Sequence, residues 1–197
     1  MTMQISTVFA FRKSVRTYTS EEIPPAVIEQ LLTWASYAPS AGALYPLSYI
    51  IIQRGQQREA TVAATFCGTQ LDQPQKWILA APLLLAICGD LKRVKEKYGG
   101  TGLDLLSMLS QDCGAAVENI LLGAVSIGLG GCYITGFRQD ALSTALRLPQ
   151  RIVPLALVAL GHGTVAPQSR KPRPVTVYEN WYGNGWNAQG AEKAPDQ

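Results

Sequence analysis

Apolar residues follow two patterns along the chain, with helical spacing in some stretches and continuous runs in others. Helical spacing is clear after Pro25, whose ring suits the first turn of a helix. The apolar residues that share this spacing are Val27, Ile28, Leu31, Leu32 and Ala35. We expect this helix to end at Pro39, because proline cannot continue it.

Continuous runs of apolar, β-branched and aromatic residues predict strands. Their sequences are LSYIIIQ, PLLLAICGD, GGCYITGF and VPLALVALG. Shorter helices are predicted at STVFAF, at residues 56–65 and in the stretch with Ala141, Leu142, Ala145 and Leu146. A long helix over residues 103–127 is apolar nearly all round, which predicts a central position. Strands and helices intermix without a repeat or a linker, so we expect one α+β or α/β sandwich domain.

Two stretches fall outside these patterns. Residues 91–102, LKRVKEKYGGTG, are charged and rich in glycine near their end, so they form either a surface lid or a solvated loop. The tail from residue 164 is rich in proline, polar and aromatic residues and cannot build its own core, so we expect it to lie on another surface. Residues 186–197 are polar and are expected to be flexible.

Composition limits the classes of function. The chain has 197 residues, of which 47% are hydrophobic and 16% charged, enough for one good core. The net charge of +3 is small and scattered, which favours a small anionic ligand over a nucleic acid. The start of the chain lacks the pattern of a signal peptide, and the most apolar stretch contains Glu118 and Asn119. We therefore expect no membrane span.

Cysteine and histidine residues exclude further classes. There are 4 cysteines, no C-x-x-C pair and a single histidine, His162, which argues against a zinc site or another metal site. Catalysis by a Ser-His-Asp or Cys-His set would need His162 as the base. The cysteines lie among apolar residues, which predicts buried thiols and a reducing, cytoplasmic setting. Residues 161–166 match a dinucleotide-binding pattern, but the PQSRKPRP that follows cannot form the required helix.

Two short basic stretches are candidate anion sites. In an extended chain Arg12, Ser14 and Arg16 alternate onto one side, which offers two guanidinium groups with a hydroxyl between them. Lys171 and Arg173 flank a proline that holds the backbone extended. The two stretches form one site only if the fold brings them together.

A structural explanation is open for each basic stretch. Arg12 and Lys13 also suit the C-terminus of the first helix, with Arg16 solvated. The basic tail could equally face solvent. Residues 39–46, PSAGALYP, are similarly ambiguous, because small residues between prolines mark either a close approach of the backbone to another group or an ordinary loop.

Taken together, the motifs resemble the nitroreductase family of FMN-dependent oxidoreductases over about residues 5–185. The sequences that carry the resemblance are RKSVR, APSAG, WILAAPLLLAIC, AAVENILLGAVSIGLGGCYITGF, ALGHG and KPR. Each motif alone is a weak signal, but the order and spacing of all of them together are specific. The resemblance implies an α+β sandwich with a mostly antiparallel central sheet flanked by helices. It also implies an intertwined homodimer, in which residues 1–185 are a single FMN-binding domain.

The resemblance also assigns candidate FMN-binding residues. They are Arg12, Lys13, Ser14, Arg16, Pro39, Ser40, Ala41, Gln75, Gly136, Lys171 and Arg173. In the family pattern, basic residues and a serine hold the FMN phosphate and ribityl chain, the roles expected of Arg12, Ser14, Lys171 and Arg173. Arg16 is expected beside the N1 and O2 edge of the flavin ring, where a positive charge stabilises the reduced, anionic flavin.

The remaining candidates are expected around the flavin ring. Gln75 resembles a residue that reads the pyrimidine edge, and the backbone N–H of Gly136 resembles the group that faces N5. The segment Pro39–Ala41 is expected to cover the flavin of the other subunit across the dimer interface. The long helix then forms the dimer core, and the VYENWYGNGW tail wraps the other subunit.

The implied reaction is ping-pong hydride transfer from NADH or NADPH, through the flavin, to an electron-poor acceptor such as a nitroaromatic or a quinone. No side chain stands out as an acid or base, which a flavin enzyme permits. The sequence departs from the commonest family pattern, because Ala43 replaces an asparagine and GALYPL resembles the branch of azoline-oxidising dehydrogenases. Oxidation of an azoline-like heterocycle and a flavin-binding protein without turnover are therefore the alternatives.

Overall fold

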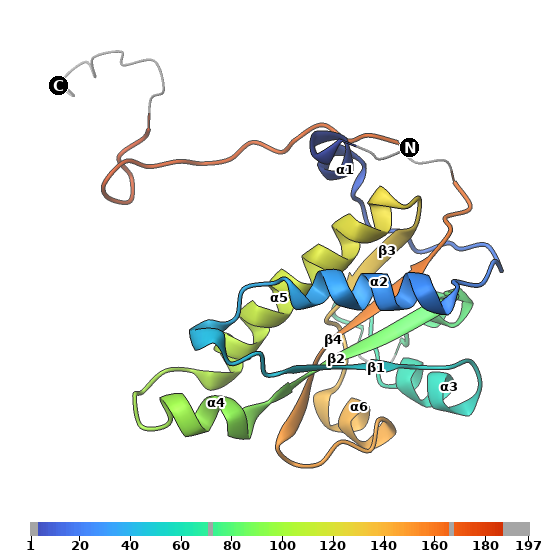
Figure 1. Cartoon of the computed structure of the whole chain (residues 1–197), viewed down its shortest axis with the longest axis horizontal. Helices are drawn as coiled ribbons and strands as arrows, with labels where there is room; N and C mark the ends of the chain where they lie inside the picture. The colour runs from blue at the N-terminus through green and yellow to red at the C-terminus, as the bar shows by residue number, and fades with distance from the viewer. Residues whose placement is uncertain (1–3, 71–72, 166–167, 187–197) are drawn as a thin grey trace.

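The computed structural model describes residues 4–70, 73–165 and 168–186 and contains a four-stranded antiparallel sheet between two layers of helices (Figure 1). The strands are β1 (Leu47–Ile51), β2 (Leu83–Asp90), β3 (Gly130–Ile134) and β4 (Ile152–Gly161). Their order across the sheet is β1-β2-β4-β3, and every neighbouring pair is antiparallel. The predicted α+β class and antiparallel sheet are confirmed.

The helices fall where apolar spacing predicts them, except α4 and the two short 3-10 helices, which the pattern did not indicate. They are α1 (Ile5–Phe11), α2 (Pro25–Ser36), α3 (Gln56–Ala63), α4 (Leu91–Tyr98), α5 (Leu105–Ser126) and α6 (Gln139–Ala145), with short 3-10 helices η1 (Ala41–Ala43) and η2 (Lys76–Ala80). The α2 helix ends at Ser36, earlier than expected. The residues from Tyr37 then lead into η1.

The central strand β2 separates two apolar cores. Leu83, Leu85 and Ile87 pack into the core that α2 and α5 cover. The alternate residues, Leu84 among them, pack into a second core with Ile78 of η2. Every residue from Leu83 to Gly89 is buried, which explains the continuous apolar run in the sequence.

The long helix α5 is fixed by its cap and by close packing against α2. The carboxylate of Asp104 accepts hydrogen bonds from the backbone N–H groups of Leu106 and Ser107, at 3.0 and 3.1 Å. Near its C-terminus, Gly123 lies against the indole of Trp34, and a Cβ atom there would overlap the ring. The expected central helix is confirmed, although one side of it is exposed at Ser110 and Glu118.

Residues 91–98 are helix α4, so the expected lid or solvated loop over residues 91–102 is wrong for this part. Asp90 caps the helix by accepting hydrogen bonds from the N–H groups of Lys92 and Arg93. Val94 is buried and anchors one side of α4. The charged residues that suggested a loop therefore form the exposed face of an amphipathic helix.

The prediction of buried thiols is right for three cysteines and wrong for one. Cys88, Cys113 and Cys132 are buried, and Cys67 is exposed. Cys67 pairs with Gln70 in an isolated bridge around a tight turn at Gly68, whose φ of 57° is in the left-handed region. A surface turn thus places an apolar residue type in solvent.

The tail lies mostly off the body of its own chain, and its expected place on the other subunit stays a prediction. Its backbone is tied to the body where the N–H of Arg170 donates to the carbonyl of Ala10, at 3.0 Å. Beyond this point the tail runs away from the body (Figure 1) and exposes aromatic residues such as Trp181 and Tyr182. Its internal contacts form a small hairpin in which the rings of Tyr178 and Tyr182 lie 4.7 Å apart. Most of the segment 186–197 that was expected to be flexible, residues 187–197, lies outside the described residues.

Candidate functional site

The first basic stretch runs extended along the edge of the sheet. The backbone N–H of Val15 donates to the carbonyl of Gly131 in β3, at 2.9 Å. Arg12, Ser14 and Arg16 all lie within electrostatic or hydrogen-bonding range of the buried thiol of Cys132. Burial raises the pKa of this thiol, and the three residues partly oppose that rise. The expected alternation of these residues onto one side is therefore present.

Lys13 lies on the other side of the same extended segment. Together with Val15 it lines a hollow that also contains His162 and Gly163. The structure thus separates Lys13 from Arg12 and Ser14, because neighbouring residues of an extended chain point in opposite directions.

The side chain of Arg12 forms an ion pair with a residue of α5. Its Nε atom lies 3.4 Å from Oε1 of Glu118, and the Arg12 side chain is only 18% exposed. Among the described residues this is the only carboxylate that pairs with Arg12. The contact uses Nε, so the two terminal nitrogens of the guanidinium remain available to an anion.

Arg16 makes a different contact. Its guanidinium lies over the ring of Trp77 in η2, with the central carbon 5.8 Å from the ring centroid. The ring of Tyr18 lies 6.5 Å from that of Trp77. Within the described parts of the chain, Arg16 has no ion pair and no hydrogen bond. Arg16 is therefore a cation that lies on the face of an aromatic ring and has no carboxylate partner among the described residues.

Gln75 and Gly136 meet at one corner of the molecule. The side-chain amide of Gln75 donates to the carbonyl of Phe66, at 2.8 Å, and more weakly to that of Gly136, at 3.4 Å. The carbonyl of Gly136 also accepts from the N–H of Phe66, at 2.8 Å. A Cβ atom on Gly136 would lie 2.7 Å from the carbonyl oxygen of Phe66. In the described residues the N–H of Gly136 has no hydrogen-bond partner.

The second basic stretch lies against α1. Lys171 and Arg173 line a surface hollow with Ser6 and Phe9 of that helix. The N–H of Arg170 donates to the carbonyl of Ala10, two residues before Arg12, so the second stretch begins near the first and runs along α1. No hydrogen bond or ion pair between described residues joins them.

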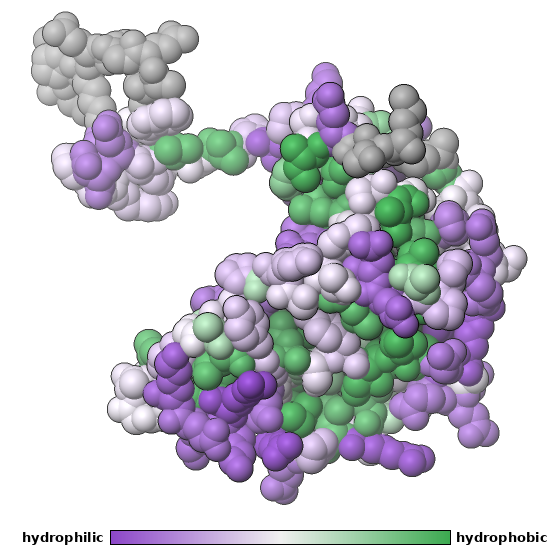
Figure 2. Space-filling model, viewed as in Figure 1, coloured by the Kyte–Doolittle hydropathy of each residue, from purple (hydrophilic) through white to green (hydrophobic). Residues whose placement is uncertain are grey.

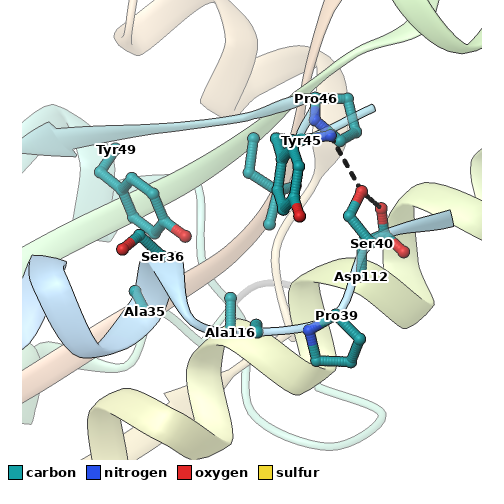
Figure 3. Close-up of a pocket in the computed structure, with 11 residues that line it drawn as sticks. Ala35, Ser36, Pro39, Ser40, Tyr45, Pro46, Tyr49, Asp112 and Ala116 are labelled. Atoms are coloured by element: carbon teal, nitrogen blue, oxygen red, sulfur yellow. Dashed lines mark hydrogen bonds between the residues drawn. The ribbon is translucent and has the colours of Figure 1, made fainter. Parts of the chain in front are cut away.

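Pro39 and Ser40 form the lip of a pocket of about 360 Å³, and Ala41 follows them in the chain (Figure 3). The carboxylate of Asp112 in α5 accepts a hydrogen bond from the hydroxyl of Ser40, at 2.7 Å, and one from the N–H of Ala41, at 3.0 Å. The Ser40 hydroxyl in turn accepts from the N–H of Tyr45, at 3.0 Å. The other residues that line the pocket are Ala35, Ser36, Ala38, Pro46, Leu47, Tyr49 and Ala116.

The loop that carries this lip has an unusual backbone. Gly42, Ala43 and Tyr45 all have φ between 47° and 58°, in the left-handed region that only glycine adopts at low cost. Helix α4 holds the loop from outside, since Lys97 donates to the carbonyl of Gly42, at 2.8 Å, and Arg93 to that of Tyr45, at 3.3 Å. The small residues thus allow a tight path that longer side chains would obstruct.

The sheet separates the two halves of the expected site within one chain. Pro39–Ala41 follow α2 on the side of the first core, where Tyr49 and Ala116 lie. Gln75 precedes η2, which packs into the second core on the opposite face. A single chain therefore does not bring Pro39–Ala41 to Gln75 and Gly136.

Sequence reasoning missed three residues that organise these places. Asp112 is a buried acid within an apolar helix, and such a residue signals a polar partner. Glu118 lies on the same helix and holds Arg12. Trp77 lies two residues after Gln75, within a stretch that reads as ordinary apolar core. Only the tertiary structure reveals its contact with Arg16.

Two classes of site are absent from the described part of the chain. Among those residues no group of three or more His, Cys, Asp or Glu side chains could hold a metal ion. No described helix has the length and apolar character needed to cross a membrane.

Comparisons with known proteins identify the family. The sequence profile of the nitroreductase family matches residues 9–162. An oxygen-insensitive NADPH nitroreductase of Salmonella typhimurium is 30% identical over 177 residues, which cover 86% of this chain and 71% of that protein. An NADPH-flavin oxidoreductase of Vibrio harveyi is 29% identical over 189 residues, which cover 92% and 75%. The crystal structure of nitroreductase A from Vibrio parahaemolyticus superposes with a TM-score of 0.78 at 28% identity, covering 92% of this chain and 78% of that one. This chain is a member of the nitroreductase family.

Proposed function

We propose that this protein is an FMN-dependent oxidoreductase that takes reducing equivalents from NADH or NADPH and passes them to an electron-poor acceptor such as a nitroaromatic or a quinone. Family membership and the names of its relatives, NADPH nitroreductase and NADPH-flavin oxidoreductase, support this activity. When bound, FMN supplies the chemistry by accepting and donating hydride at N5. Four free cysteines support a reducing, cytoplasmic setting.

The residues present fit FMN at the corner formed by η2 and the end of β3. The observation that carries the proposal concerns two groups expected to face the flavin, the guanidinium of Arg16 and the N–H of Gly136. Among the described residues neither group has a hydrogen-bond or ion-pair partner, and Arg16 contacts only the face of Trp77. An unpaired cation and an unpaired N–H are the groups that a flavin ring, with its acceptors at N1, O2 and N5, satisfies.

Each residue of the site then has a physical role. Arg12, Ser14, Lys171 and Arg173 bind the phosphate and ribityl chain, because guanidinium and hydroxyl groups suit phosphate oxygens. The charge of Arg16 stabilises negative charge at the N1 and O2 edge. Gly136 provides a backbone N–H, and as a glycine it has no side chain of its own to cover that group.

The nitrogen of the Gln75 side-chain amide is already used in hydrogen bonds within the protein. Its Nε2 group donates to the carbonyls of Phe66 and Gly136, so it holds the corner together. Its side-chain oxygen is left as the group that can accept a hydrogen bond from the pyrimidine edge of the flavin.

A homodimer with FMN at the subunit interface completes the proposal. Because the sheet separates Pro39–Ala41 from Gln75 and Gly136 within one chain, a second copy is needed to supply both to one flavin. Apolar surface is also available for an interface. Figure 2 shows it over α1, where Ile5 and Phe9 are 66% and 56% exposed, and beneath α2. The projecting tail, with Trp181 exposed, is a second surface for the partner chain.

Anaerobic reduction tests the activity. NADH and then NADPH are added to the protein, loaded with FMN, while the visible absorbance of the flavin is recorded. Rapid bleaching by either nucleotide, followed by reoxidation with a quinone, is the expected result. Protein that binds no FMN, or bound FMN that neither nucleotide reduces, contradicts the proposal, and the second outcome favours a dehydrogenase that oxidises its substrate.

Subunit mixing tests the shared site. One chain carries Arg16→Ala together with Arg12→Ala, and the other carries Ser40→Trp, which fills the pocket lip. In a heterodimer with sites built from both chains, one site is doubly damaged and the other is intact. Mixing two inactive variants should therefore restore turnover and FMN binding at up to one site per dimer. No recovery, with heterodimers confirmed by mass spectrometry, would show that each site lies within a single chain.

A further inference from the structure

Arg16 needs a fixed position if its charge is to act on one edge of a ligand. An arginine side chain has several rotatable bonds and loses considerable entropy when it is held in place. The side chain of Arg16 lies at the surface and has no carboxylate partner among the described residues. Its contact with the face of Trp77 is therefore the interaction that holds the guanidinium.

Trp77 is itself held firmly by the core. It packs against the second apolar core, and its ring neighbours that of Tyr18. Tyr18 is buried, and its hydroxyl donates to the carbonyls of Val15, at 2.5 Å, and Ala159, at 3.2 Å. The platform beneath Arg16 is thus anchored to the sheet.

The backbone on both sides of Trp77 is also anchored. Before it, the N–H of Gln75 donates to the hydroxyl of Thr65, at 2.9 Å. After it, the guanidinium of Arg58 donates to the carbonyls of Ala81 and Ile52. Arg58 is 2% exposed, so these contacts are shielded from water. The segment from Gln75 to Ala81 is therefore fixed at both ends, with Trp77 between them.

We infer that Trp77 is a positioning residue that holds the Arg16 guanidinium at the edge of the flavin ring, and so sets how strongly the site prefers reduced over oxidised FMN. This inference rests on the proposed function, since it requires FMN beside Arg16. Trp77 acts through Arg16 and needs no contact with the reacting atoms.

The midpoint potential of the bound flavin is the direct readout, because it reports the relative affinity for the two redox states. An exposed cation–π contact is worth a factor of about two to five in an equilibrium constant. For a two-electron couple this factor corresponds to about 10 to 20 mV. We expect Trp77→Leu to move the potential to more negative values by this amount, and Trp77→Phe, which keeps an aromatic face, to move it less.

A double-mutant cycle separates positioning from a general structural effect. Arg16→Ala alone should also lower the potential, and adding Trp77→Leu to Arg16→Ala should change it no further. Leu79→Ala is the matched control, because Leu79 lies on the same short helix, is 39% exposed and belongs to neither apolar core. It should leave the potential unchanged.

Two results would overturn the inference. One is an equal potential shift in the Leu and Phe variants of Trp77. The other is a Trp77→Leu shift that persists in full without Arg16. If Trp77→Leu does not fold, Trp77→Met provides the same loss of the aromatic face, and circular dichroism verifies its fold. Failure of the wild-type protein to bind FMN refutes the proposed function instead, so the two failures are distinguishable.

Discussion

Ser40 and Asp112 are joined by a 2.7 Å hydrogen bond that fixes the lip of the pocket to the long helix (Figure 3). The two residues are far apart in the sequence, and Asp112 is only 8% exposed. The same carboxylate accepts the N–H of Ala41. The loop with left-handed residues Gly42 and Ala43 is therefore held at its start by a charged acceptor.

Replacing Asp112 should destabilise the fold more than replacing Ser40. Asp112→Ala leaves the Ser40 hydroxyl and the Ala41 N–H without their acceptor, and we expect a loss of about 2 to 3 kcal/mol in unfolding free energy. Ser40→Ala removes the bond to Asp112 and the bond that the hydroxyl accepts from the N–H of Tyr45, but it leaves the Ala41 N–H paired with the carboxylate, so it should cost about 1 to 2 kcal/mol. Urea denaturation measures both. Ser110→Ala on the exposed side of the same helix is the control, and a loss there as large as for Asp112→Ala would contradict this explanation.

Arg12 and Lys13 should differ in their effect on FMN binding although they are neighbours. Loss of a charge-assisted hydrogen bond to phosphate costs about 1.5 to 3 kcal/mol, so Arg12→Ala should weaken FMN binding about tenfold or more. Lys13→Ala should weaken it less, because Lys13 lines the opposite hollow with His162. Fluorescence titration with FMN measures both affinities. Equal losses would mean that Lys13 also reaches the phosphate.

Glu118→Gln tests the ion pair with Arg12 separately. The carboxylate is 48% exposed, so the pair should contribute less than about 1 kcal/mol to the stability of the protein. Thermal and urea unfolding of the variant should therefore be close to those of the wild type. A loss of several kcal/mol in unfolding free energy would show that the ion pair stabilises the fold and does more than orient Arg12.

Gly123→Ala should destabilise the packing of α5 on α2. The added methyl group would overlap the indole of Trp34, and we expect a loss of about 1 to 3 kcal/mol. The loss should shrink in a Trp34→Leu background, because the smaller side chain leaves room for the methyl group. A double-mutant cycle from urea denaturation measures this coupling, and strict additivity of the two changes would exclude the contact as the cause.

Thiol labelling should distinguish the exposed cysteine from the buried ones. Burial raises the pKa of Cys88 to about 11 and that of Cys113 to about 12, and it also raises the pKa of Cys132. Because the thiolate is the reactive form, we expect iodoacetamide at pH 8 to modify only Cys67 in the folded protein. Cys67→Ser should abolish this fast modification, and all remaining thiols should react in urea. Rapid labelling of a second thiol in the native state would contradict the burial.

The same raised pKa values predict loss of stability in alkaline solution. An unfolded cysteine loses its proton near pH 9, whereas the buried thiols of Cys88 and Cys113 keep theirs to about pH 11 and 12. Between these values the folded state binds more protons, so unfolding free energy falls as the pH rises from 9 toward 12. Replacing Cys113 with alanine should make this decline less steep in urea denaturation at constant ionic strength.

The elements of the fold were predictable because they depend on local patterns. The buried run of β2 and the helical spacing after Pro25 are each visible within a few residues, and so is the alternation of Arg12, Ser14 and Arg16. The capped helix at residues 91–98 was missed, since its only buried anchor is Val94 and its charges also suit a loop. The order of the sequence motifs further indicated the nitroreductase family.

Only the tertiary structure decided which residues meet. Asp112 and Ser40, Glu118 and Arg12, and Trp77 and Arg16 are pairs from separate elements. The packing of α5 and η2 against the sheet brings them together, and a linear pattern carries no signal for contacts of that kind. The sheet also divides the expected flavin-binding residues between its two faces. The sequence by itself thus determined most of the elements and the chemistry available, whereas long-range packing decided which residues become partners and on which face of the sheet each expected site residue lies.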